Sequence, residues 1–152
     1  MENEKTIEVL NTLITINNDR IEGYETAAKE TSEQELKTLF AQFSATSLKC
    51  KQQLIIEVAK LGGKHEEGTL LSGKFFRVWM DVKAALTGKD RKAILNSCEF
   101  GEDAAIDTYN KELTKNLKDL PSDIHVLLNA QRELIKADRE NIKSLRDALI
   151  EA

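Results

Sequence analysis

The sequence predicts an all-α protein built as a bundle of four long helices, and three observations support this fold class. The 152 residues include one proline and seven glycines, so helix-breaking residues are scarce. Apolar residues recur every three to four positions along four long segments, which is the period of an amphipathic helix. Hydrophobic residues make up 41% of the chain and charged residues 32%, so it can enclose a core as one domain over residues 1–152.

The first two helices are expected over residues 5–30 and 32–61. Ser32-Glu33-Gln34-Glu35 has the pattern of a capping box at the start of the second helix, in which the serine and the last glutamate satisfy free backbone amides. Gly62-Gly63 should end this helix, because glycine readily adopts the left-handed conformation of a helix C-terminus. Since so few residues join the two helices, they should form an antiparallel hairpin.

Pro121 separates two further helices, which are expected over residues 90–118 and 122–150. The connection between them is also short, so they should form a second antiparallel hairpin.

The connection between the two hairpins, residues 62–89, is much longer than a turn requires. Its middle, residues 74–86, has the pattern of a short amphipathic helix. A connection of this length can run along the whole ~42 Å of a neighbouring long helix. Two hairpins joined by one long crossover form the ferritin-like arrangement of the four-helix bundle. The alternative is a five-helix bundle in plain up-and-down order.

Several polar side chains fall on the apolar stripes of the predicted helices. They are Asn17 with Arg20 beside it, Thr46, Ser47, Glu102, Gln131 and Asp138. A chain that folds back near residue 120 places Glu102 and Asp138 opposite each other, and the first hairpin places Asn17 near Ser47. All these groups should therefore lie in one polar layer at the centre of the bundle. Burying two carboxyl groups side by side is unfavourable unless they share a proton, meet a cation or bind a metal.

One interpretation of this layer is a metal site, or the remnant of one. A ferritin-like dimetal centre uses a glutamate from each of two helices and a Glu-x-x-His pair from each of the other two. The chain contains no Glu-x-x-His, and its histidines, His65 and His125, fall far from the predicted layer. No cofactor is therefore expected.

A divergent site for iron or another divalent metal is the alternative. It would use Glu102 and Asp138, with Glu25 or Glu99 as a third ligand. The favoured interpretation is a buried hydrogen-bonded network that fixes the helix register, with Arg20 balancing the charge.

The predicted crossover helix carries Phe75, Trp79 and Val82 on one face. This face either packs on the bundle or forms a subunit interface, because an aromatic-rich outer helix would expose an apolar patch. We therefore expect the chain to self-associate.

Composition and missing motifs exclude several function classes. With 22 Lys and Arg against 26 Asp and Glu, the net charge is −4, which does not fit a nucleic-acid partner. The sequence shows no secretory signal and no membrane span, so a cytoplasmic location is expected. It lacks a Walker loop, a dinucleotide-binding glycine motif and a G-x-S-x-G elbow, which argues against an enzyme and identifies no small-molecule ligand.

Two longer motifs resemble a bacterial family of ferritin-like four-helix-bundle proteins of unknown function. They are the segment from Trp79 to Gly88 and the segment from Cys98 to Ala105 followed by Tyr109. The resemblance implies a ferritin-like fold in a bacterial cytoplasm, with Glu102 in the family's most distinctive motif, and it supplies no activity. Members of the family more often carry histidine at the position of Asp138. This difference weakens the argument for a metal site in this chain.

The sequence therefore predicts a ferritin-like bundle without a complete dimetal site. We expect a non-catalytic structural or interaction protein. Analogy with other ferritin-like proteins suggests a role in stress physiology.

Overall fold

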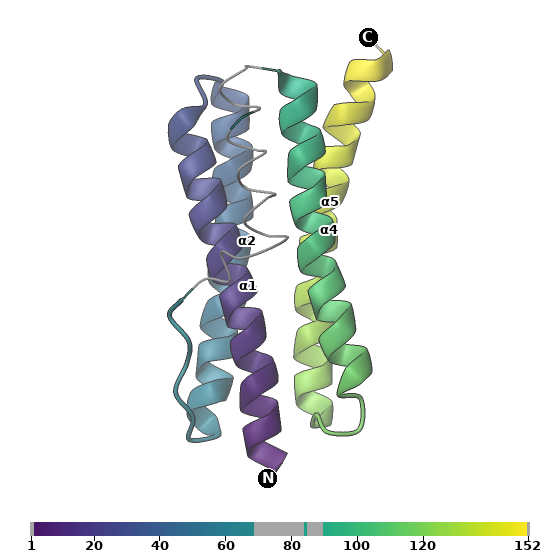
Figure 1. Cartoon of the computed structure of the whole chain (residues 1–152). Helices are drawn as coiled ribbons and strands as arrows, with labels where there is room; N and C mark the ends of the chain where they lie inside the picture. The colour runs from purple at the N-terminus through teal and green to yellow at the C-terminus, as the bar shows by residue number, and fades with distance from the viewer. Residues whose placement is uncertain (1, 69–83, 85–89, 152) are drawn as a thin grey trace.

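The computed structural model describes residues 2–68, 84 and 90–151. Within these residues the chain forms four helices, α1 (Glu2–Glu30), α2 (Gln34–Lys60), α4 (Arg91–Lys115) and α5 (Ser122–Glu151), and no strand (Figure 1). The all-α class is confirmed, and each helix begins and ends within three residues of its predicted bounds.

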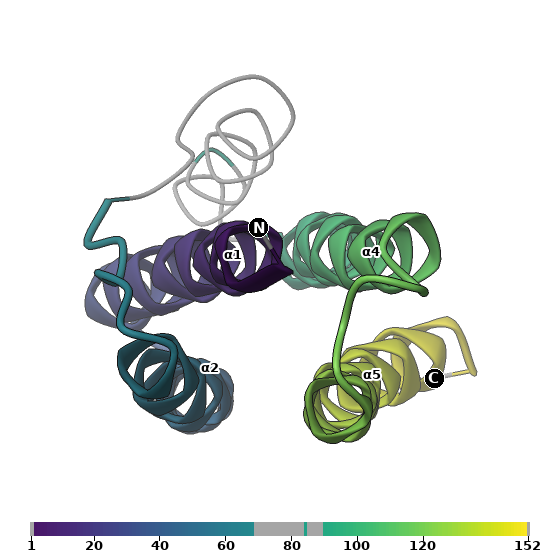
Figure 2. The same cartoon turned by 90° about the horizontal axis from the view of Figure 1, so that it is seen from below.

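The four helices pair as two antiparallel hairpins, α1 with α2 and α4 with α5, as predicted. Seen along the bundle axis in Figure 2, they occupy the corners of a square, with α1 beside α4 and α2 beside α5. In Figure 1, α2 ends near the N-terminus of the chain, whereas α4 begins at the opposite end of the bundle. The connection between the hairpins therefore joins opposite ends.

The predicted crossover helix over residues 74–86 falls outside the described residues, apart from Ala84. Its proposed interface residues Phe75, Trp79 and Val82 lie outside them as well. The described helices contain no apolar stretch of the kind that crosses a membrane.

The predicted capping box is wrong. Helix α2 begins at Gln34, its N-cap is Glu33, and no side chain caps its first amides. Thr31 forms the tight turn between α1 and α2. Its amide donates to the Ala27 carbonyl, and its hydroxyl accepts from the Glu33 amide. Ser32 therefore lies one residue too early to cap the helix.

The predicted glycine stop of α2 is confirmed. Gly62 has φ +77°, in the left-handed region. Its amide donates to the Ala59 carbonyl at 3.0 Å, and the Gly63 amide donates to the Val58 carbonyl at 3.0 Å, which is the Schellman pattern of a helix end. Gly63 also lies against Ile7, whose Cδ1 would be 2.8 Å from an added Cβ.

Asparagine side chains of α1 hold the start of the connection. Asn11 donates from Nδ2 to the Lys64 carbonyl at 3.0 Å and accepts from the Glu66 amide at 2.9 Å. Two turns further along α1, Asn18 donates to the Gly68 carbonyl at 2.9 Å. The connection thus begins by running alongside α1, away from the end where α2 stops.

The apolar core forms two clusters, one toward each end of the bundle. The cluster at the N-terminal end of α1 includes Leu10, Leu13, Leu54, Val58, Leu113, Ile124 and Leu128. The other includes Tyr24, Leu36, Phe40, Phe43, Ile94, Leu95 and Ile142. Buried polar side chains from all four helices lie between these clusters.

Candidate functional site

The central feature of this polar zone is the Arg20 side chain, which is 1% exposed. Its Nη2 lies 2.8 Å from both carboxylate oxygens of Glu102 on α4 and 3.2 Å from Oδ2 of Asp138 on α5. Its Nη1 donates to the Ser47 hydroxyl on α2 at 2.5 Å. Each of the four helices therefore contributes one side chain to this cluster, which we call the arginine centre.

Arg20 stays charged in this centre. Burial alone would lower the pKa of its guanidinium, but the neighbouring carboxylate of Glu102 and, more weakly, that of Asp138 raise it above its usual value. Arginine suits such a position because its planar, delocalised cation can contact several acceptors at once.

The two carboxyl groups of the centre are held at a higher pKa than usual. Glu102 is fully buried and Asp138 is 4% exposed. In both cases burial raises the pKa, and the attraction of Arg20 offsets it only in part. Glu102 also accepts a hydrogen bond from the Tyr24 hydroxyl. Both carboxyl groups therefore bind a proton more tightly than a carboxyl group in water does.

A second polar layer lies one helical turn before Arg20 on α1. Asn17 Nδ2 donates to the Tyr109 hydroxyl at 2.9 Å, and this hydroxyl donates to Gln131 Oε1 at 2.8 Å. Gln131 Nε2 in turn donates to the Cys50 carbonyl at 3.1 Å and to Gln53 Oε1 at 3.0 Å. We call Asn17, Tyr109, Gln131 and Gln53 the tyrosine relay. It also joins all four helices.

The structure brings Glu102 and Asp138 together as the hairpin register predicts, because both contact the same nitrogen of Arg20. The prediction of one polar layer is wrong, since Asn17 and Gln131 belong to the relay. Gln131 and Asp138 are seven residues apart on α5, or roughly 10 Å along the helix, so they cannot share one level.

The other predicted ligands do not join the arginine centre. Glu25 is exposed on α1. Glu99 accepts from Arg139 Nη2 at 3.1 Å and from Arg146 Nη1, so it is occupied by partly buried ion pairs outside the centre. Among the residues that the structure describes, no group of three His, Cys, Asp or Glu side chains could hold a metal ion.

Both histidines lie away from the arginine centre. His65 follows the end of α2 and lies 3.8 Å from Glu67, and His125 contacts the Leu117 carbonyl at 3.0 Å. Neither imidazole is near the two central carboxyl groups, as the sequence predicts.

The two cysteines are buried and free. Burial raises the pKa of the Cys50 thiol to about 11 and raises that of Cys98 further. Both thiols are therefore protonated at neutral pH, which fits the role of small apolar side chains and disfavours a nucleophile or metal ligand.

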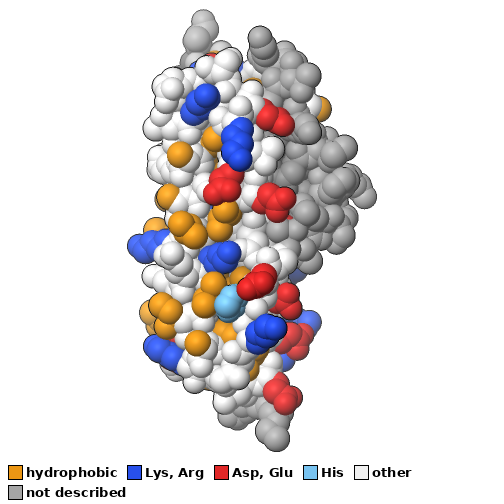
Figure 3. Space-filling model, turned by 90° about the vertical axis from the view of Figure 1, so that its left-hand side faces the viewer, with side chains coloured by type: hydrophobic (Ala, Val, Ile, Leu, Met, Phe, Trp, Pro, Cys, Tyr) orange, Lys and Arg blue, Asp and Glu red, His pale blue; other side chains and the backbone are white. Residues whose placement is uncertain are grey.

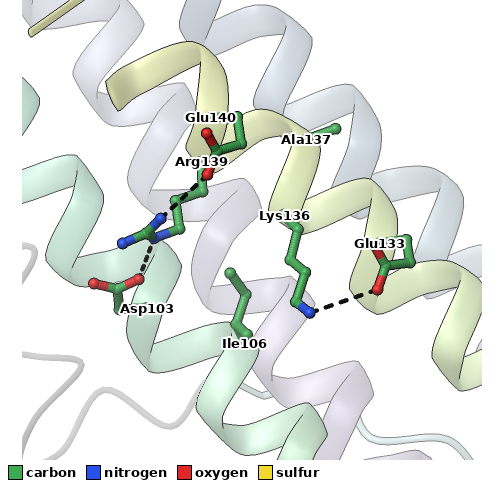
Figure 4. Close-up of a pocket in the computed structure, with 7 residues that line it drawn as sticks. All are labelled: Asp103, Ile106, Glu133, Lys136, Ala137, Arg139 and Glu140. Carbon is green, nitrogen blue, oxygen red and sulfur yellow. Dashed lines mark hydrogen bonds and ion pairs between the residues drawn. The ribbon is translucent and has the colours of Figure 1, made fainter. Parts of the chain in front are cut away.

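The outer groove between α4 and α5 is lined mainly by charged side chains that pair with one another. Figure 4 shows Arg139 bound to Asp103 and Glu140, and Lys136 bound to Glu133. The charged side chains of this groove are thus paired with one another.

The face formed by α1 and α2 carries dispersed apolar side chains. Leu48 and Ile56 on α2 are 46% and 56% exposed. Figure 3 shows that apolar side chains on this side of the molecule are interspersed with acidic and basic ones. Such scattered exposure is common on protein surfaces and does not define a binding site.

The fold and the centre define a class of protein: an all-α protein in which the four described helices enclose a buried arginine–carboxylate cluster. The chain matches the domain of unknown function DUF2383 over residues 5–115 and belongs to this family. The match includes Arg20, Ser47 and Glu102, whereas Asp138 on α5 lies beyond it. The search of curated proteins found no match.

Sequence reasoning missed two hydroxyl groups that complete these layers. Tyr24 and Tyr109 are fully buried, and helical spacing alone predicts only that they face the apolar core. A useful signal is available in the residue type, because a buried tyrosine normally needs a hydrogen-bond partner for its hydroxyl.

Proposed function

We propose that this chain is a ferritin-like bundle in which the Arg20 guanidinium takes the place of metal ions between inward-facing carboxyl groups. It acts as a non-catalytic structural or interaction protein. The observation that carries this proposal is the contact of one Arg20 nitrogen with both Glu102 and Asp138. The ferritin-like assignment is supported by two antiparallel hairpins whose connection joins opposite ends of the bundle.

The donor set of the centre does not fit a dimetal site. Such a site in this fold uses four carboxylates and two imidazoles. The centre supplies only the carboxylates of Glu102 and Asp138, and Arg20 already contacts both. A divalent ion there would lie against the guanidinium, and two cations in a buried site repel each other strongly.

Burial of the centre supports a structural role. Arg20, Ser47 and Glu102 are all 1% exposed or less, so a substrate has no access to them. A hydrogen-bonded cluster that draws side chains from all four helices favours one helix register over others. We infer that the centre specifies how the two hairpins pack together.

The test is elemental analysis of protein purified without chelators from cells grown with iron, manganese and zinc. We expect far less than one ion per chain for the wild type and for two matched variants. These are Glu102→Ala in the centre and Glu99→Ala on the same helix, where the glutamate is partly buried and lies outside the centre.

Near-stoichiometric metal in the wild type would contradict the proposal if it disappears in Glu102→Ala and persists in Glu99→Ala. That result would instead support a divergent metal-binding protein that uses Glu102 and Asp138.

A further inference from the structure

Two buried polar atoms, one in the arginine centre and one in the tyrosine relay, have no partner among the described residues. They are the donor Nε of Arg20 and the acceptor Oδ1 of Asn17. Arg20 is 1% exposed and Asn17 is 0% exposed, so bulk water does not reach either side chain. Buried polar atoms without a partner are rare in folded proteins, and each one needs an explanation.

The orientation of the Asn17 amide is fixed by its neighbours. Its Nδ2 lies 2.8 Å from the Leu13 carbonyl, which can only accept, so the nitrogen must face it. The same nitrogen donates to the Tyr109 hydroxyl at 2.9 Å, whose own hydrogen goes to Gln131. Oδ1 is therefore the atom of the amide that still needs a donor.

The free donor and the free acceptor belong to side chains that are neighbours on one helix. Asn17 and Arg20 are three residues apart on α1, which places them on the same face about 5–6 Å apart at Cβ. Because helical side chains lean toward the N-terminus, the aliphatic stem of an arginine at position 20 is expected to run toward the turn that carries Asn17. The terminal nitrogens of Arg20 are already taken by Ser47, Glu102 and Asp138.

We propose that one buried water molecule binds between Arg20 Nε and Asn17 Oδ1, accepting from the first and donating to the second. The occupant must both accept and donate, which water does in a small volume. A cation would face the Nε–H and the guanidinium charge. An anion would join a centre where two carboxyl groups already face one guanidinium.

This water links the two polar layers into one hydrogen-bonded network across the bundle. The network runs from Gln53 through Tyr109 and Asn17 to Arg20 and Glu102. The proposal goes beyond the proposed function and does not depend on it, because it rests only on the two atoms without partners.

The test uses nuclear magnetic resonance of the full chain in water, with the Nε–H proton of Arg20 as the probe. We expect a cross peak between this proton and water that changes sign between the laboratory-frame and rotating-frame experiments, as a long-lived bound water gives. The partly exposed Arg139 Nε–H serves as the control for simple proton exchange, which gives no change of sign.

Two variants test whether the cross peak depends on the proposed water or on the arginine centre in general. Asn17→Leu keeps the side-chain volume but removes the acceptor, so we expect at least a several-fold loss of the cross peak. Ser47→Ala removes a different partner of the same guanidinium and should leave the cross peak in place.

The proposal is overturned if wild-type Arg20 Nε–H shows no such cross peak. It is also overturned if the peak is equally strong in Asn17→Leu. The wild-type measurement decides the matter even if a variant does not fold.

Discussion

Arg20 Nη2 lies 2.8 Å from each carboxylate oxygen of Glu102, in a position where neither side chain is more than 1% exposed. A buried pair of this kind adds little net stability compared with apolar residues, but removing one partner leaves an uncompensated charge.

Replacing Arg20 with methionine should destabilise the fold strongly. Arg20→Met fills most of the volume but leaves Glu102 and Asp138 facing each other without a cation, so we expect a loss of about 3–5 kcal/mol in the free energy of unfolding. Urea denaturation followed by circular dichroism measures this loss.

The matched control is Arg139→Met, which removes a partly exposed arginine that also binds acidic side chains on α4. Exposed ion pairs contribute little, so its loss should stay below about 1 kcal/mol. Equal losses for the two variants would show that burial of Arg20 has no special effect.

The contribution of Glu102 to the free energy of unfolding should increase as the pH falls. The pKa of Glu102 is raised in the folded protein, so this carboxyl group binds its proton more tightly there than in the unfolded chain. Its contribution to stability is therefore fully present below the ordinary carboxyl pKa of about 4.3 and is lost as the pH rises through the raised value.

The measurement compares wild type with Glu102→Gln, which is neutral at every pH. The free energy of unfolding of the wild type, relative to this variant, should increase on going from pH 7.5 to pH 5. A relative decrease over the same interval would mean that the folded protein prefers the charged carboxylate.

Gly62→Ala should destabilise the protein by about 1 kcal/mol, because alanine is strained in the left-handed conformation at φ +77°. Gly68→Ala is the matched control, since an added Cβ there meets nothing within 4 Å and the glycine has no positive φ. Thermal unfolding of both variants checks the difference. If Gly68→Ala is the more damaging substitution, the assigned role of Gly62 in ending α2 is wrong.

The sequence predicts that the chain self-associates through the crossover helix, and the oligomeric state in solution tests this prediction. We propose that Trp79→Ala weakens a wild-type oligomer in sedimentation velocity runs over a range of concentrations. Phe100→Ala is the control, because Phe100 is 68% exposed on α4 and lies outside the predicted interface. A wild-type monomer at the highest concentration would contradict the proposal.

The sequence could predict the level of Glu102 and Asp138 because helical period and hairpin length together fix both the face and the height of a residue. Neither quantity describes how far a long side chain reaches. Arg20 was placed beside the apolar stripe of its helix, yet its flexible stem carries the guanidinium to three other helices. Because side-chain reach cannot be read from helical period and hairpin length, the sequence predicts one polar layer where the structure has two.

Contacts between a loop and a helix were also beyond sequence reasoning. Asn11 and Asn18 bind backbone groups of residues 64–68 through side chains that look like ordinary helix positions. Only the path of the connection determines these partners, and that path depends on the packing of the whole bundle. The failed capping box has a similar origin, because the tight turn at Thr31 displaced the helix start by one residue.

The most direct test of the arginine centre is a crystal structure of protein purified without chelators, with anomalous data at the iron, manganese and zinc edges. We expect planar guanidinium density between Glu102 and Asp138 and no anomalous peak there. An anomalous peak bound to both carboxyl groups, or side chains of Glu102 and Asp138 turned toward solvent, would contradict this description of the core.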